Sequence, residues 1–66
     1  MFIETIEGRL QNVILLQDVI VIENDDETYS IGYVQVNGEV IKEGEYNSSS
    51  DAESERQNIY DSLLAL

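Results

Sequence analysis

Carboxylates supply almost all of the chemistry that this sequence has available. The 66 residues include 14 acidic and three basic side chains, no histidine and no cysteine, which gives a formal net charge of −11. Nucleophilic catalysis needs a hydroxyl or thiol beside a base. The serines at 48–50 have only Lys42 as a candidate base, and we expect it on a strand away from them. Disulfides and zinc sites built from thiolates and imidazoles are excluded by composition.

Pairs of carboxylates perform acid–base catalysis in glycosidases, but they work in a cleft that holds the substrate. A chain of 66 residues offers little concavity. The segment Asn24-Asp25-Asp26-Glu27 carries oxygen ligands, yet it lacks the alternating spacing, central glycine and distal glutamate of an EF-hand loop. We therefore expect no enzymatic activity, no metal site and no cofactor, and a protein that acts by binding.

The net charge indicates the kind of partner. A chain with 14 acids and three cations repels nucleic acid and anionic membranes, and it attracts basic proteins. Acidic residues also keep small proteins soluble, although self-repulsion at −11 works against folding. The sequence leaves both explanations of the charge open.

Length and hydropathy predict one soluble domain over residues 1–66 that resides in the cytoplasm. The start of the chain has no basic segment and no long apolar run typical of a signal peptide. The longest nearly apolar stretch, 13–22, is interrupted by Gln17 and Asp18 and is too short to span a bilayer. A domain of this size buries a small core, so self-association is one expected source of stability.

The first segment has two interpretations. Phe2, Ile6, Leu10 and Val13 are spaced as on one face of a helix, which predicts a short helix over 2–13. Gly8 disfavours that helix. The alternative is a strand over 1–6 that ends in a turn at residues 7–8.

Residues 18–46 predict a three-stranded antiparallel meander. The first strand covers 19–22, the second covers 28–36 and the third covers 39–46, each rich in β-branched or aromatic residues. Asn37-Gly38 is typical of a two-residue hairpin loop, because both positions of a type I′ turn need positive φ. A second two-residue loop at Asp25-Asp26 completes the meander.

These two loops set a register, and the register assigns each side chain to a face. It pairs Val34 with Ile41 and Ile20 with Ile31. One face then carries Ile20, Ile22, Tyr29, Ile31, Tyr33, Val40 and Tyr46, and the other carries Val19, Val21, Val34, Val36 and Ile41 beside Glu23, Glu39, Glu43 and Glu45.

A C-terminal amphipathic helix is expected over 51–65. Ser50 serves as the N-cap and Glu53 completes a capping box. The apolar residues of this segment form a stripe that packs on the isoleucine–tyrosine face of the sheet. The predicted fold is therefore α+β with the order α-β-β-β-α.

Two candidate interaction surfaces follow from this arrangement. The first is acidic and combines strand, turn and helix carboxylates, namely Asp25, Asp26, Glu27, Glu39, Glu43, Glu45, Asp51, Glu53 and Glu55. The second is an apolar patch on the face of the sheet opposite the C-terminal helix, namely Val19, Val21, Val34, Val36 and Ile41. The patch is open if the N-terminal segment lies beside the C-terminal helix, and it is covered if that segment packs on this face.

In size, charge and expected architecture the chain resembles the small acidic inhibitors that bacteriophages encode, including some anti-CRISPR proteins. The likeness rests on the meander over 19–46 and the helix over 50–66, and it carries over no site residues. It implies a small sheet with one or two helices and, in several members, imitation of DNA. The hairpin at 37–41 followed by a capped helix is also similar to half of a double-stranded RNA-binding domain. Asp51, Glu53 and Glu55 stand where that domain has lysines, which argues against RNA binding.

Two hypotheses of function result. The first is a non-enzymatic inhibitor whose carboxylates dock on a basic, nucleic-acid-handling protein, with no direct binding of nucleic acid or membrane. The alternative is a small homodimeric accessory subunit that pairs through the valine-rich patch, in which the acidic charge serves solubility.

Overall fold

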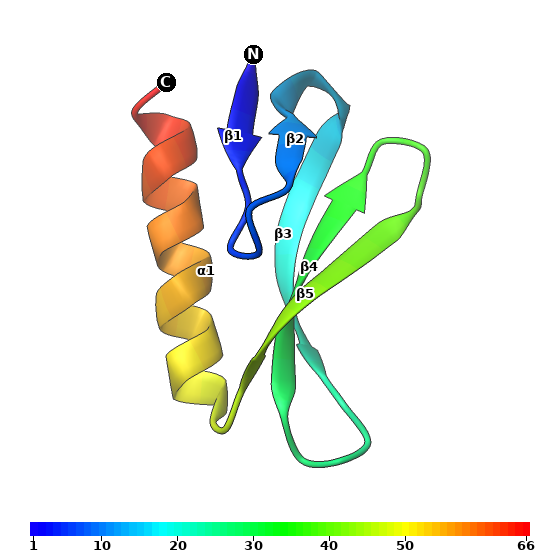
Figure 1. Cartoon of the computed structure of the whole chain (residues 1–66), viewed down its shortest axis with the longest axis vertical. Helices are drawn as coiled ribbons and strands as arrows, with labels where there is room; N and C mark the ends of the chain where they lie inside the picture. The colour runs from blue at the N-terminus through cyan, green and yellow to red at the C-terminus, as the bar shows by residue number, and fades with distance from the viewer.

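The β-branched and aromatic runs of the chain form strands, and the segment after the serine run forms a helix. The computed structural model describes residues 1–66 in the order β1 (Phe2–Glu4), β2 (Leu10–Asn12), the short 3-10 helix η1 (Val13–Leu15), β3 (Leu16–Glu23), β4 (Tyr29–Gln35), β5 (Val40–Tyr46) and α1 (Ser49–Leu64). Strands β3, β4 and β5 form a three-stranded antiparallel sheet, and β1 and β2 form a separate hairpin (Figure 1). The expected α+β class, meander and C-terminal helix are confirmed. No helix has both the length and the apolar character needed to cross a membrane.

The N-terminal segment forms a hairpin, so the expected helix over 2–13 is wrong and the alternative strand-and-turn interpretation is closer. Gly8 has φ +83°, a left-handed conformation that a glycine adopts without steric cost in a turn. Its N–H donates to the carbonyl of Thr5 at 2.9 Å, and the Thr5 N–H donates to the carbonyl of Arg9 at 2.7 Å. The turn therefore reverses the chain where a helix would need to continue.

Both loops of the meander contain three residues, so the expected two-residue loops are wrong. In the β4–β5 loop, the Gly38 N–H donates to Gln35 and the Gln35 N–H donates to Glu39, with Gly38 at φ +90°. A tight turn followed by one left-handed residue is the usual three-residue hairpin. The β3–β4 loop has the same form, closed by Asn24 and Thr28, with Glu27 at φ +66°.

The extra loop residue shifts each register by one position and reverses the facing of two strands. Val19 lies opposite Tyr33 and Val21 opposite Ile31, whereas the expected pairing placed Ile20 opposite Ile31. Strand β4 contributes the expected residues to the core, but β3 and the first part of β5 turn the opposite set inward. The register irregularity near Gly44 restores the expected facing at the end of β5, so Tyr46 packs against the core as expected. The buried core is Val19, Ile31, Tyr33 and Ile59, and partly buried around it lie Ile3, Ile6, Leu16, Val21, Ile41, Tyr46, Tyr60 and Leu63.

Helix α1 packs on this inner face and also covers the outer edge of β3. Its N-cap is Ser48, which accepts from the Asp51 N–H at 3.2 Å, so the expected cap at Ser50 is two residues late. The Arg56 Nε and the Tyr60 hydroxyl both donate to the Val19 carbonyl, at 2.8 and 3.2 Å. These bonds occupy a carbonyl of an edge strand that would otherwise be free to pair with another chain.

The β1–β2 hairpin lies beside α1 on the same face of the sheet (Figure 1) and is fixed there by a polar network. The Arg9 Nε donates to the carboxylate of Glu43 on β5 at 2.8 Å, and the Glu7 N–H donates to the same carboxylate at 3.2 Å. The side-chain amides of Gln11 and Gln35 are buried and bond each other in both directions, at 2.8 and 3.1 Å. The hairpin is therefore held by satisfied polar contacts as well as by apolar packing.

Gly44 interrupts β5 opposite the hairpin, at the register irregularity between Tyr29 and Ile31. It has φ +77°, and a Cβ there would lie 2.6 Å from Ile6 Cδ1. We expect Gly44→Ala to lower the free energy of unfolding by about 2 kcal/mol, because backbone strain and displacement of the Ile6 side chain add together. Gly38→Ala is the matched control, since Gly38 has φ +90° with no atom within 4 Å of its Cβ position. Urea unfolding of the control should show backbone strain alone, about 1 kcal/mol; equal losses would contradict a close approach at Gly44.

Candidate interaction site at the acidic end

Three segments that are distant in sequence bring carboxylates to one end of the molecule. The β3–β4 loop, the end of β5 and the start of α1 lie together at the lower end of the long axis in Figure 1. All the carboxylates there are exposed. This acidic end consists of Glu23, Asp25, Asp26, Glu27, Glu45, Asp51 and Glu53.

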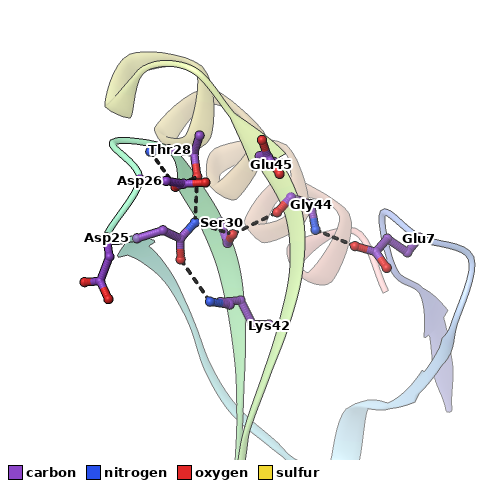
Figure 2. A pocket seen from close by; sticks show the side chains of 9 residues that line it. Glu7, Asp25, Asp26, Thr28, Ser30, Lys42, Gly44 and Glu45 are labelled. Carbon is purple, nitrogen blue, oxygen red and sulfur yellow. Dashed lines mark hydrogen bonds between the residues drawn. The ribbon is translucent and has the colours of Figure 1, made fainter.

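Part of the acidic end borders a shallow cleft that no hydrophobic residue lines (Figure 2). Hydrogen bonds order the side chains of its wall. The Asn24 amide donates to the hydroxyls of Thr28 at 3.1 Å and Ser30 at 2.9 Å, and its oxygen accepts from the Lys42 ammonium at 3.0 Å. Ser30 in turn donates to the Gly44 carbonyl at 2.8 Å and so ties β4 to β5. The cleft therefore presents fixed polar groups, with Lys42 as its one cationic side chain.

Asp26 is held in its ionised form by the loop that carries it. The side-chain hydroxyl and then the backbone N–H of Thr28 donate to this carboxylate, and together they lower the pKa of Asp26 below its usual value. The same bonds fix the three-residue loop, in which Glu27 adopts the left-handed conformation. The negative charge of this loop is consequently both persistent and fixed in position.

The structure brings most of the predicted acidic residues together, and separates three of them from the rest. Asp25, Asp26, Glu27, Glu45, Asp51 and Glu53 belong to the acidic end. Glu39 closes the opposite hairpin loop between β4 and β5, and Glu55 lies against the N-terminal hairpin beside Thr5 and Ile6. The third, Glu43, is buried.

Glu43 is the clearest correction among the acidic candidates. It was expected on the same exposed face as Glu45, but its side chain is only 5% exposed and pairs with Arg9. The register shift turns Glu43 inward, and the irregularity at Gly44 leaves Glu45 exposed. Burial by itself would raise the pKa of Glu43, but hydrogen bonds from Thr5, Arg9 and the Glu7 N–H outweigh it and lower that pKa. Glu43 is thus a structural residue and cannot contact a partner.

The apolar patch proposed from the sequence does not exist as a surface. Val19 is fully buried, and Val21 and Ile41 pack against the core on the face that α1 and the hairpin cover. Val34 faces away from the helix, and Val36 is exposed in the β4–β5 loop. The opposite face instead carries Ile20, Ile22 and Val40, whose side chains lie over Gly32.

Sequence reasoning missed Glu23 at the acidic end, because the expected register placed it beside the valines. A three-residue loop at 25–27 brings Glu23 opposite Tyr29 at the end of β3.

Among the described residues, no group of three or more acidic side chains is arranged to hold a metal ion. Comparison with known proteins found no matching family model, curated protein or solved structure.

Proposed function

We propose that this chain is a non-enzymatic, cytoplasmic binding protein that docks its acidic end on a basic, nucleic-acid-handling protein and inhibits it. This places it with the small acidic inhibitors of bacteriophages, among them anti-CRISPR proteins and DNA mimics. The observation that supports the proposal is the convergence of three segments, the β3–β4 loop, the end of β5 and the start of α1, on one acidic end.

The chemistry of the acidic end favours a cationic partner. The concentrated negative field of these carboxylates attracts a basic groove that normally binds phosphates, and it raises the association rate. The bonds from Thr28 that keep Asp26 ionised also keep its loop ordered, so little conformational entropy is lost when a partner binds. Lys42, the one cationic side chain of the cleft, offsets only one of the seven negative charges of the acidic end.

Two triple variants test the proposal at equal change of net charge. The first, Asp25→Asn, Asp26→Asn and Glu45→Gln, neutralises part of the acidic end. The control, Glu4→Gln, Glu39→Gln and Asp61→Asn, neutralises exposed carboxylates elsewhere. Basic proteins captured from a cell extract on the immobilised chain, and eluted by double-stranded DNA, would be purified and their association rates measured between 50 and 300 mM salt.

We expect the association rate to fall about tenfold or more for the first variant and to change little for the control. For the unmodified chain we expect the affinity to decrease steeply as salt increases, because the encounter is electrostatic. Salt-insensitive binding, or equal loss in both variants, would contradict docking through the acidic end.

A further inference from the structure

The N-terminal hairpin buries little apolar surface where it meets the rest of the molecule. Strands β1 and β2 pair with each other and with no strand of the main sheet (Figure 1). Phe2 is 59% exposed and Leu10 is 66% exposed. The large apolar side chains of the hairpin that pack against the core are Ile3 and Ile6, and both remain partly exposed. The hydrophobic contribution to docking of the hairpin is therefore small.

The sheet surface beneath the hairpin carries polar groups that bond to it. The Tyr33 hydroxyl, the Gln35 amide and the Glu43 carboxylate all take part, and Gln35 and Glu43 are buried. Water can satisfy each of these groups when the hairpin leaves. Helix α1, by contrast, buries Ala52 and Ile59. Polar interfaces like the one under the hairpin are typical of parts of one chain that move relative to each other.

The η1 connection has the features of a hinge between the hairpin and the sheet. On one side, the Val13 N–H donates to the Met1 carbonyl at 2.9 Å, so Val13 belongs to the hairpin. On the other side, the Leu15 carbonyl accepts from the Val36 N–H at 2.9 Å, which ties Leu15 to the β4–β5 loop. Ile14 lies between them and is 79% exposed, and no residue of η1 is buried. Rotation of the backbone at Ile14 therefore disturbs little packing.

We propose that the N-terminal hairpin, residues 1–13, is a strap that opens from the sheet as one unit about η1 while the sheet and α1 stay folded. An isolated two-stranded hairpin is marginally stable at best, so the hairpin loses its own strand pairing when it opens. The remaining unit keeps the packing of α1 on the sheet, with Val19, Ile31 and Ile59 in its core. Opening exposes Gln35 and Glu43, so the open state presents a polar sheet face that the closed state covers.

Hydrogen exchange of single amides in the full chain, followed by NMR, tests the proposal. Two amides report on the hairpin, namely the Thr5 N–H, bonded within the hairpin, and the Glu7 N–H, bonded to the sheet. The amides of Ile31 and Tyr33, at the buried centre of β4, report on the remaining unit. Relative to the rates of an unstructured chain, we expect the hairpin amides to exchange about 100-fold faster than those of β4, or more. Equal protection of both sets would overturn the proposal.

Ala52→Gly distinguishes opening of the hairpin from unfolding of the whole chain. Ala52 is fully buried near the start of α1, at the end of the helix away from the hairpin (Figure 1). Glycine destabilises the helix and should raise exchange of the β4 amides about fivefold. The closed and open states both contain α1, so exchange of the hairpin amides should not change. A parallel rise in the hairpin amides would show that the hairpin unfolds only together with the sheet, which would overturn the proposal.

Arg9→Gln tests whether the polar contacts hold the hairpin closed. The substitution leaves Glu43 without its cation, so the hairpin amides should exchange about tenfold faster or more. Glu4→Gln is the control, because it neutralises an exposed carboxylate on β1 and should change the exchange less than about twofold. If Arg9→Gln exchanged no faster than this control, the polar contacts would not be what closes the hairpin, and the proposal would fail. The assay contains no partner, so its outcome is independent of the function proposed above.

Discussion

Tyr33→Ala is expected to leave the chain largely unfolded at 25 °C. Tyr33 is fully buried at the centre of β4 and packs with Val19, Ile31 and Ile59, so it joins the sheet to α1. Removal of a buried aromatic side chain costs about 3–5 kcal/mol. The whole stability of a domain this size is roughly 3–10 kcal/mol. Far-ultraviolet circular dichroism and urea titration would measure the loss.

Tyr33→Phe separates packing from polar contacts at the same site. The Tyr33 hydroxyl accepts from the Ile6 N–H at 3.4 Å, a long bond whose loss should cost less than about 1 kcal/mol. Tyr29→Ala, on the same strand but half-buried, serves as the second control and should remain folded. If Tyr33→Ala were no more destabilising than Tyr29→Ala, the assignment of Tyr33 to the centre of the core would be wrong.

The sequence predicted the elements of the sheet and the helix, because their signals are local. Runs of β-branched and tyrosine residues identify β3, β4 and β5 without knowledge of their partners. The N-terminal hairpin was harder to predict. The spacing of Phe2, Ile6, Leu10 and Val13 fits a helix, and the contacts that favour strands there, with Glu43 and Gln35, come from distant residues. Tertiary packing therefore overrode a local periodicity.

The register could not be predicted because the loop residues suit two loop lengths. Asn37-Gly38 fits a two-residue loop with two positive-φ positions, and it equally fits a three-residue loop in which Gly38 alone is left-handed. The sequence indicates the three-residue loop at Glu27 even less, since a glutamate rarely adopts positive φ. One added residue in each loop was enough to exchange the two faces of β3, and those of β5 as far as Gly44.

The candidate site was predicted correctly only where it does not depend on that register. Acids in loops and at the start of the helix, such as Asp25 and Asp51, are exposed whichever way the strands face, and their expected exposure is confirmed. Strand residues followed the register error, so Glu43 and Val19 moved from the surface into the interior. The exposed apolar side chains of Met1, Ile14 and Leu64 were not predicted to lie near one another, because they come together only where β1, η1 and α1 meet in space.

Glu43→Gln is expected to lower the free energy of unfolding by about 2–3 kcal/mol at pH 7. The substitution leaves Arg9 without its partner and weakens the acceptor for the Glu7 N–H. Loss of one member of a buried pair costs about 3–5 kcal/mol, and the estimate here is smaller because the Arg9 side chain is 34% exposed. Glu45→Gln is the control on the same strand, and its exposed carboxylate should contribute less than about 0.5 kcal/mol.

The difference between the unmodified chain and Glu43→Gln should disappear in acid. In the folded protein, hydrogen bonds and the charge of Arg9 outweigh the effect of burial and hold the pKa of Glu43 below the usual glutamate value of 4.5. The folded state therefore binds fewer protons than the unfolded state near that pH, and the stabilisation by Glu43 is complete at higher pH and lost as the pH falls. Protonation of the other carboxylates relieves repulsion equally in both proteins. The difference between the unfolding free energies of the two proteins, measured with urea at each pH from 7 to 3, therefore gives the contribution of Glu43 alone. A difference that stayed constant over this range would mean that Glu43 stabilises the hairpin by packing, without a contribution from its charge.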